Sequence, residues 1–184
     1  MKQRYPKETR SSANKLDREG LSLLIRKPDE AKELLSSAAI MYSHSGVTQM
    51  VNLKERLKET RTIHPDTIED ICRDLNKAAG LFALIGKPES AKKEYALAFK
   101  AFYTGFLIYL ERGNILRAQM YIHRASDAAS RAWGENAKFA TLTFLNDLQE
   151  HGENAKFIKE LSVYTQNIHD IGLPEVVSER VAEL

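Results

Sequence analysis

PESAKKEYALAFKAFYTGFLIYLER, residues 88–112, is the stretch that decides the predicted fold class. Between Tyr95 and Leu110, its only charged residue is Lys100. A helix that is apolar around nearly its whole circumference has to be covered by neighbours on most sides. We therefore expect this stretch to be the central helix of an all-α fold.

The composition agrees with a helical protein of one domain. The chain has 184 residues, enough for one well-formed core, and its nine Gly and five Pro leave few breaks for a β-rich fold. The first eleven residues are polar and basic and include Pro6. We therefore expect a flexible tail at 1–11 and a single helical domain at 12–184.

Capping and turn residues divide the rest of the chain into further helices. Asparagine or serine at an N-cap, proline at the first helical position and glycine after the last turn mark such boundaries. Helices are therefore expected at 12–27, 28–46, 47–62, 65–85, 88–112 and 115–133. Gly134, Gly152 and Gly172 separate two more, and Pro174 begins a short terminal helix. Apart from the short terminal helix, the total is about eight helices, with Gly46 ending the second one.

Residues 75–98, LNKAAGLFALIGKPESAKKEYALA, combine small residues with two aromatic ones at regular spacing. The pattern consists of Leu75, Ala78, Ala79, Phe82, Gly86, Ala91, Tyr95 and Ala98. It resembles one tetratricopeptide repeat, in which small residues let two antiparallel helices approach closely. With weaker copies on its C-terminal side, the resemblance covers about residues 65–165. It implies antiparallel hairpins in an irregular, right-handed α-α superhelix.

The resemblance also implies a binding groove, since the first helix of each tetratricopeptide repeat lines a concave surface. The residues that it directs inward are Arg73, Asn76, Lys77, Lys100, Tyr103 and Thr104. Periodicity independently places Lys93, Lys100, Thr104 and Glu111 on one narrow polar stripe of an otherwise apolar helix. This stripe either meets water or lines a ligand groove.

A second candidate surface is the helix expected at 115–133. Arg117, Arg124 and Arg131 repeat every seven residues and border a face rich in alanine. Small residues indicate close packing there, so the three arginines would form a basic seam along its edge, able to pair with carboxylates or phosphates. The seam either braces acidic helices near the C-terminus or binds an acidic partner.

Local motifs for catalysis or cofactor binding are absent from the sequence. The five histidines form no HExxH pair or zinc-type cluster, and the glycines form no phosphate-binding loop. His123 and Asp127 could share a helix face, but two groups do not make a metal site. The lone Cys72 lies on an apolar face and is expected to be a buried thiol. We assign no catalytic, cofactor-binding or metal-ligating residue.

Charge is nearly balanced overall, at +2, but it is spread unevenly. Residues 1–62 carry 13 Lys and Arg against 8 Asp and Glu, whereas residues 135–184 carry 4 against 9. This asymmetry favours either two solvated faces or contact between copies of the chain. With neither a signal peptide nor a membrane-spanning run recognised, we expect a cytoplasmic protein.

These features favour a protein-interaction module, an adaptor or regulatory scaffold that binds a peptide or partner protein, acidic or not, in a helical groove. The alternative is an RNA-associated helical-repeat protein that uses the arginine seam. An enzyme without a recognisable motif is third. Salt separates the first two, because binding to nucleic acid falls steeply as salt rises.

Overall fold

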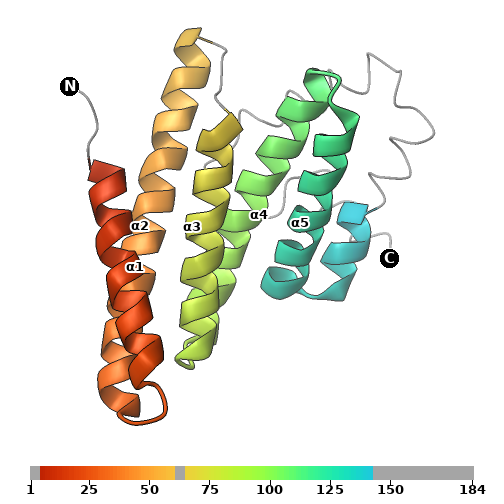
Figure 1. Ribbon diagram of the computed structural model, residues 1–184. Helices are drawn as coiled ribbons and strands as arrows, with labels where there is room; N and C mark the ends of the chain where they lie inside the picture. Colours follow the sequence, from red (N-terminus) through yellow and green to blue (C-terminus); the bar gives the residue numbers. More distant parts are fainter. Residues whose placement is uncertain (1–4, 61–64, 143–184) are drawn as a thin grey trace. The chain divides into compact units, whose positions relative to one another are not determined.

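The computed structural model describes residues 5–60 and 65–142, and these residues form α-helices without any strand (Figure 1). This confirms the all-α prediction. The helices are α1 (Tyr5–Leu23), α2 (Pro28–Thr60), α3 (Pro65–Leu84), α4 (Pro88–Glu111) and α5 (Ile115–Trp133). A shorter helical stretch follows at 135–142. The helices expected beyond it lie outside the described residues.

Most helix starts follow from local chemistry, as the sequence indicates. Pro28, Pro65 and Pro88 are the first residues of α2, α3 and α4, and an acidic residue follows each of them. Proline has its φ preset for the first turn and needs no hydrogen-bond acceptor there. The predicted cap of α5 is confirmed, because the Asn114 side chain accepts a hydrogen bond from the Arg117 amide at 3.2 Å.

Helix α2 is continuous, so the prediction of two helices that meet at Gly46 is wrong. Gly46 is buried inside α2 rather than placed after its last turn. A β-carbon there would lie 2.7 Å from Cγ of Leu75 on α3, closer than real contacts allow. The glycine therefore serves close packing between two helices.

Helix α1 begins at Tyr5, so residues 5–11 are helical where we expected a flexible tail. Arg10 explains this difference, because its side chain is fixed by ion pairs with Asp70 and Asp74 of α3. A contact that spans some sixty positions in the chain leaves no trace in local composition. Gly20, nearer the end of α1, packs closely against Leu35 of α2.

The burial expected for the central helix is confirmed. Every residue of α4 from 98 to 110 is buried. Phe99 and Phe106 are completely buried, and the Phe99 ring meets Trp133 of α5 edge-on, with ring centroids 5.4 Å apart. The sequence pattern thus identified the most enclosed helix among the described residues. Cys72 of α3 is also buried, as predicted.

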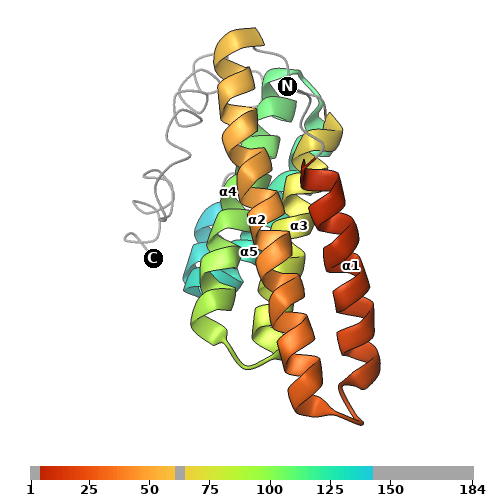
Figure 2. The ribbon, with the colours of Figure 1, turned by 90° about the vertical axis from the view of Figure 1, so that its left-hand side faces the viewer.

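The chain divides into two compact units, the first ending at Glu94 and the second beginning at Tyr95. In the first unit, α1, α2 and α3 lie side by side (Figures 1 and 2). In the second, α5 runs antiparallel along the larger part of α4 (Figure 1). Because α4 belongs to both units, the expectation of one helical domain stays a prediction. Across the described residues, no helix has the length and apolarity needed to cross a membrane.

Candidate functional site

Helix α5 has two chemically distinct faces. Its buried face consists mainly of small residues, namely Ala118, Tyr121, Ile122, Ala125, Ser126, Ala128 and Ala129. The exposed face carries Leu116, Met120, Arg124 and Asp127. All three arginines of the predicted seam are exposed, and they are aligned because seven residues are close to two helical turns. The arginine seam, Arg117, Arg124 and Arg131, is therefore one line along α5.

The Arg131 side chain packs against a tyrosine of α4. Its Nη1 donates a hydrogen bond to the Tyr95 hydroxyl at 3.0 Å, and the guanidinium carbon lies 5.2 Å from the ring centroid. Tyr95 is buried, whereas Arg131 is exposed. The ring therefore supports a cation that still faces solvent.

Arg117 repeats this arrangement near the start of α5. Its Nη1 donates to the Tyr109 hydroxyl at 3.0 Å, and its guanidinium carbon lies 5.4 Å from that ring centroid. Arg124 lies midway and is exposed. At a rise of about 1.5 Å per residue, adjacent arginines of the seam are about 10 Å apart along the axis. The two outer guanidinium groups are thus held in place, a feature that the sequence did not reveal.

The predicted groove residues on α3 already have partners or face solvent. Arg73 forms an ion pair with Asp70 of its own helix. Lys77 lies 3.5 Å from a carboxylate oxygen of Asp17 on α1, and Asn76 is exposed. Two of the three side chains therefore take part in contacts within the first unit.

The predicted groove residues on α4 are buried. Lys100 is 7% exposed, and Tyr103 and Thr104 are each 4% exposed. The Thr104 hydroxyl donates to the Lys100 carbonyl at 2.8 Å, so its own helix satisfies it. At these positions the polar stripe does not meet water, contrary to the first of our two interpretations. These residues and those on α3 belong to different units, and a shared groove stays a prediction.

A buried ionic cluster joins the three helices of the first unit. Arg10 of α1 donates through Nε and Nη2 to the Asp74 carboxylate, at 2.8–3.0 Å. From α2, Ser45 Oγ donates to Asp74 at 2.8 Å and Gln49 Nε2 donates at 3.2 Å. The Asp74 side chain is 1% exposed. A carboxylate surrounded in this way stabilises the packing of the three helices, and a ligand could not reach it.

A second polar cluster lies nearby and is also unsuited to catalysis. The Tyr42 hydroxyl donates to Asn14 Oδ1 at 2.6 Å and accepts a hydrogen bond from Lys77 Nζ at 3.1 Å. Burial raises the pKa of Tyr42, although the hydrogen bond from Lys77 opposes this shift. The phenol therefore stays protonated at neutral pH, and its ring is completely buried. A substrate could not reach it.

Glu94 is a further buried carboxyl group, at the end of the first unit. Burial raises its pKa, and a hydrogen bond from Ser43 acts in the opposite direction. Ser43 Oγ donates to Oε1 at 2.7 Å. No hydrogen-bond partner for Oε2 is found within the described part of the chain. Burial without full hydrogen bonding favours the neutral acid.

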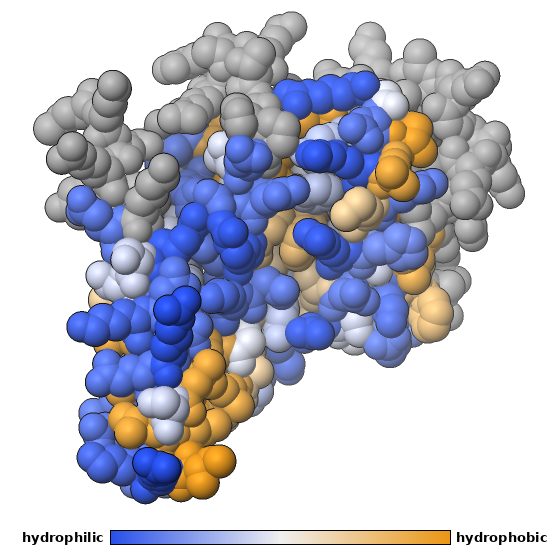
Figure 3. Space-filling model, in the orientation of Figure 1, coloured by the Kyte–Doolittle hydropathy of each residue, from blue (hydrophilic) through white to orange (hydrophobic). Residues whose placement is uncertain are grey.

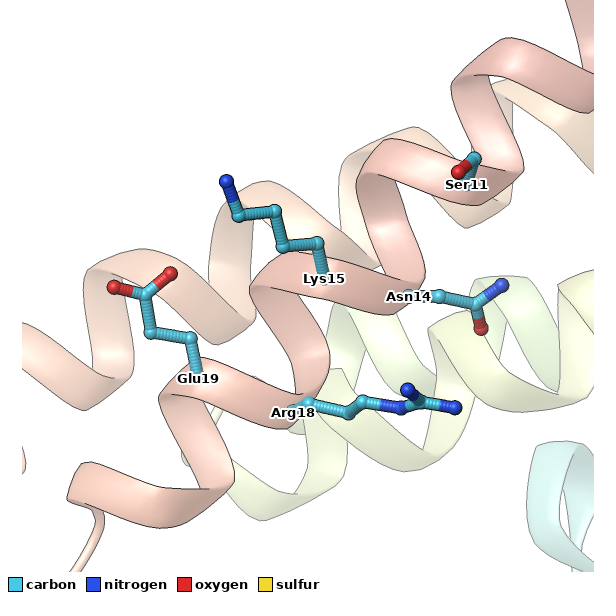
Figure 4. A pocket seen from close by; sticks show the side chains of 5 residues that line it. All are labelled: Ser11, Asn14, Lys15, Arg18 and Glu19. Atoms are coloured by element: carbon cyan, nitrogen blue, oxygen red, sulfur yellow. The ribbon is translucent and has the colours of Figure 1, made fainter.

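The surface of α1 has a shallow depression lined by Ser11, Asn14, Lys15, Arg18 and Glu19. Lys15 and Glu19 point to one side of the helix, and Asn14 and Arg18 point to another (Figure 4). All five side chains come from one helix and are polar, whereas small-molecule sites are usually enclosed and largely apolar. Over residues 5–60 and 65–142, no cluster of His, Cys, Asp and Glu could hold a metal ion.

Exposed hydrophobic side chains occur on several of the described helices. Figure 3 shows them near the connection between α1 and α2 and near the start of α5. Ile25 and Leu21 are exposed at the first place, and Leu116 and Met120 at the second. The apolar surface on α5 is therefore close to the arginine seam.

Comparisons with protein-family models, curated proteins and solved structures found no match for this chain. The tetratricopeptide resemblance thus rests on the residues from 75 to 98 that carry it, and it stays a prediction.

Proposed function

We propose that this chain is a protein-interaction module, an adaptor or scaffold, whose arginine seam binds an acidic segment of a partner protein. The observation that carries this proposal is that Arg117 and Arg131 pack against buried tyrosines of α4 and donate hydrogen bonds to their hydroxyl groups. A tetratricopeptide-like arrangement of the helices belongs to the same proposal. The partner would then be held on the outside of a helical hairpin.

Fixing an arginine before binding lowers the cost of binding. An unrestrained arginine loses roughly 0.5–1.5 kcal/mol of rotamer entropy when a partner immobilises it. The hydroxyls of Tyr95 and Tyr109 already restrain the outer two arginines of the seam. Arginine and tyrosine are also the residue types that most often dominate protein interfaces. The seam therefore has the properties of a recognition surface.

The spacing of the seam indicates what it binds. A partner helix with Glu or Asp at every seventh position presents carboxylates about 10 Å apart, which matches the spacing of the arginines. Leu116 and Met120, exposed beside the seam, offer apolar contact to the same helix. The guanidinium fork suits carboxylates in particular, because it can donate two parallel hydrogen bonds. An acidic amphipathic helix is therefore the proposed ligand.

The test measures binding of a synthetic helical peptide with glutamate at seven-residue intervals, by fluorescence anisotropy. The wild-type chain should bind it, and Arg131→Gln should weaken binding by roughly 10-fold to 100-fold, the usual range for a charge-assisted hydrogen bond. Arg18→Gln is the matched control, because Arg18 is an exposed arginine on α1. It should leave the affinity unchanged.

Three other results would contradict the proposal. Equal weakening by Arg18→Gln would mean that only overall charge matters. Loss of binding in Lys100→Met, with the seam variants unaffected, would move the site to the groove implied by the resemblance. Tighter binding of single-stranded RNA than of the peptide, with a steep dependence on salt, would favour the RNA-associated alternative.

A further inference from the structure

The two gaps between the arginines of the seam differ in chemistry. Met120 lies three residues after Arg117 and four before Arg124. Asp127 occupies the equivalent position in the second gap, three residues after Arg124 and four before Arg131. Both residues are exposed, Met120 to 48%. Because Met120 and Asp127 are seven residues apart, they lie on the same side of α5. One gap is therefore apolar and the other acidic.

Asp127 is the only acidic residue of α5. On a helix surface, an aspartate and an arginine four residues apart commonly form an ion pair. Arg131 stands in that position, but its guanidinium donates to the Tyr95 hydroxyl on α4 instead. Among residues 5–60 and 65–142, no hydrogen bond or ion pair of the Asp127 carboxylate is found. The carboxylate is therefore available to a cation of a partner.

The arginine seam alone does not fix how a partner helix is aligned along α5. A helix with glutamate at every seventh position could shift by seven residues and still pair two of the three arginines. Met120 and Asp127 oppose this shift because they require different neighbours. A second carboxylate beside Asp127 would be repelled, and a cation moved from Asp127 to Met120 would lose its partner. In paired helices, one polar position within a repeating pattern selects the register in this way.

We infer that the acidic helix proposed as the ligand carries a cation and an apolar residue between its glutamates, in the order that Asp127 and Met120 select. This inference rests on the proposed function of the seam. An antiparallel partner is favoured, because the positive N-terminal end of its helix then lies beside the negative C-terminal end of α5. Its sequence pattern in that direction is E-x-x-x-K-x-x-E-x-x-x-L-x-x-E. The first glutamate faces Arg131, the lysine faces Asp127, and the leucine faces Met120.

The test compares two synthetic helical peptides of identical composition by fluorescence anisotropy with the full chain. The matched peptide has the pattern above, and the exchanged peptide has its lysine and leucine interchanged. The wild type should bind the matched peptide about 10-fold more tightly, because the exchanged peptide places leucine over a charge and lysine over methionine. Asp127→Asn should remove most of this difference. The control Asp29→Asn, at an exposed aspartate of α2, should leave it unchanged.

A double variant, Met120→Asp with Asp127→Met, tests the register directly, because it should reverse the preference and bind the exchanged peptide more tightly. Circular dichroism of each variant checks that the helices remain folded. A preference that persists in Asp127→Asn or in the double variant would overturn the inference.

The same peptides separate this inference from the proposed function. If the wild type binds both peptides equally and Arg131→Gln weakens both, the seam binds acidic helices but Asp127 does not set their register, and the inference is wrong. If the wild type binds neither peptide, the inference and the proposed function are both wrong.

Discussion

Asp74 carries a buried carboxylate whose charge is compensated by the side chains around it. Moving a carboxylate from water into a protein interior costs several kcal/mol unless ion pairs and hydrogen bonds replace its hydration. Here Arg10 gives both, and Ser45 and Gln49 occupy further oxygen lone pairs. The three helices of the first unit must therefore dock in one register for this carboxylate to be satisfied.

Arg10→Met should lower the free energy of unfolding by about 3–5 kcal/mol, because it leaves the buried Asp74 charge without its cation. Methionine retains the aliphatic part of the side chain, so lost packing contributes little. Urea titration followed by circular dichroism measures the change. Arg18→Met, an exposed arginine on the same helix, should cost less than about 0.5 kcal/mol. Equal losses in both variants would show that the Asp74 contact does not stabilise the fold.

The sequence identified several residues of the candidate site but not their surroundings. Periodicity correctly aligned Arg117, Arg124 and Arg131, because helical spacing is a local property. It could not show that Tyr95 holds Arg131, since those residues are 36 positions apart and meet only when α4 and α5 pack. The same limit affects Lys100, where a polar position on an apolar helix indicates either water or a buried charge.

At the scale of helices, boundaries set by backbone chemistry were predictable. Proline at the first position and asparagine at a cap act within one turn, so Pro28 and Asn114 indicated their helices correctly. Gly46 was misread because glycine has two uses, ending a helix and letting another helix approach closely. Only Leu75, on a different helix, decides between them.

Helix α4 should be the most sensitive to loss of side-chain volume. Phe102 is 5% exposed and its ring lies 6.3 Å from that of Tyr121. Phe102→Ala should lower the free energy of unfolding by about 3–5 kcal/mol through lost burial and the cavity left behind. Phe139→Ala, at a position 56% exposed, should cost less than about 1 kcal/mol. A loss that small for Phe102→Ala would contradict the central role of α4.

For the whole molecule, the important fact is that one continuous helix belongs to both compact units. If the part of α4 in one unit unfolds, the part in the other unit loses backbone hydrogen bonds at the point where the two parts join. We therefore expect the two units to unfold together. The single tryptophan, Trp133, lies in the second unit and packs against Phe99, so its fluorescence reports that unit alone.

Gly46→Ala tests this coupling from the first unit. Its new β-carbon would overlap Leu75, which should cost about 1–3 kcal/mol. The thermal midpoints from Trp133 fluorescence and from circular dichroism should fall together. Gly80→Ala is the control, because no atom lies within 4 Å of the added carbon, and this change should stabilise α3 by about 0.5–1 kcal/mol. An unchanged fluorescence midpoint in Gly46→Ala would show independent units.

The burial of Cys72 makes the chain suitable for site-specific labelling. It is the only cysteine in the sequence and is 2% exposed, so a thiol reagent in solution has little access to its sulfur. Cysteines introduced at surface positions should therefore react selectively, without replacement of the native one. A donor dye in the first unit and an acceptor dye in the second would then measure the separation of the two units in an otherwise unaltered core.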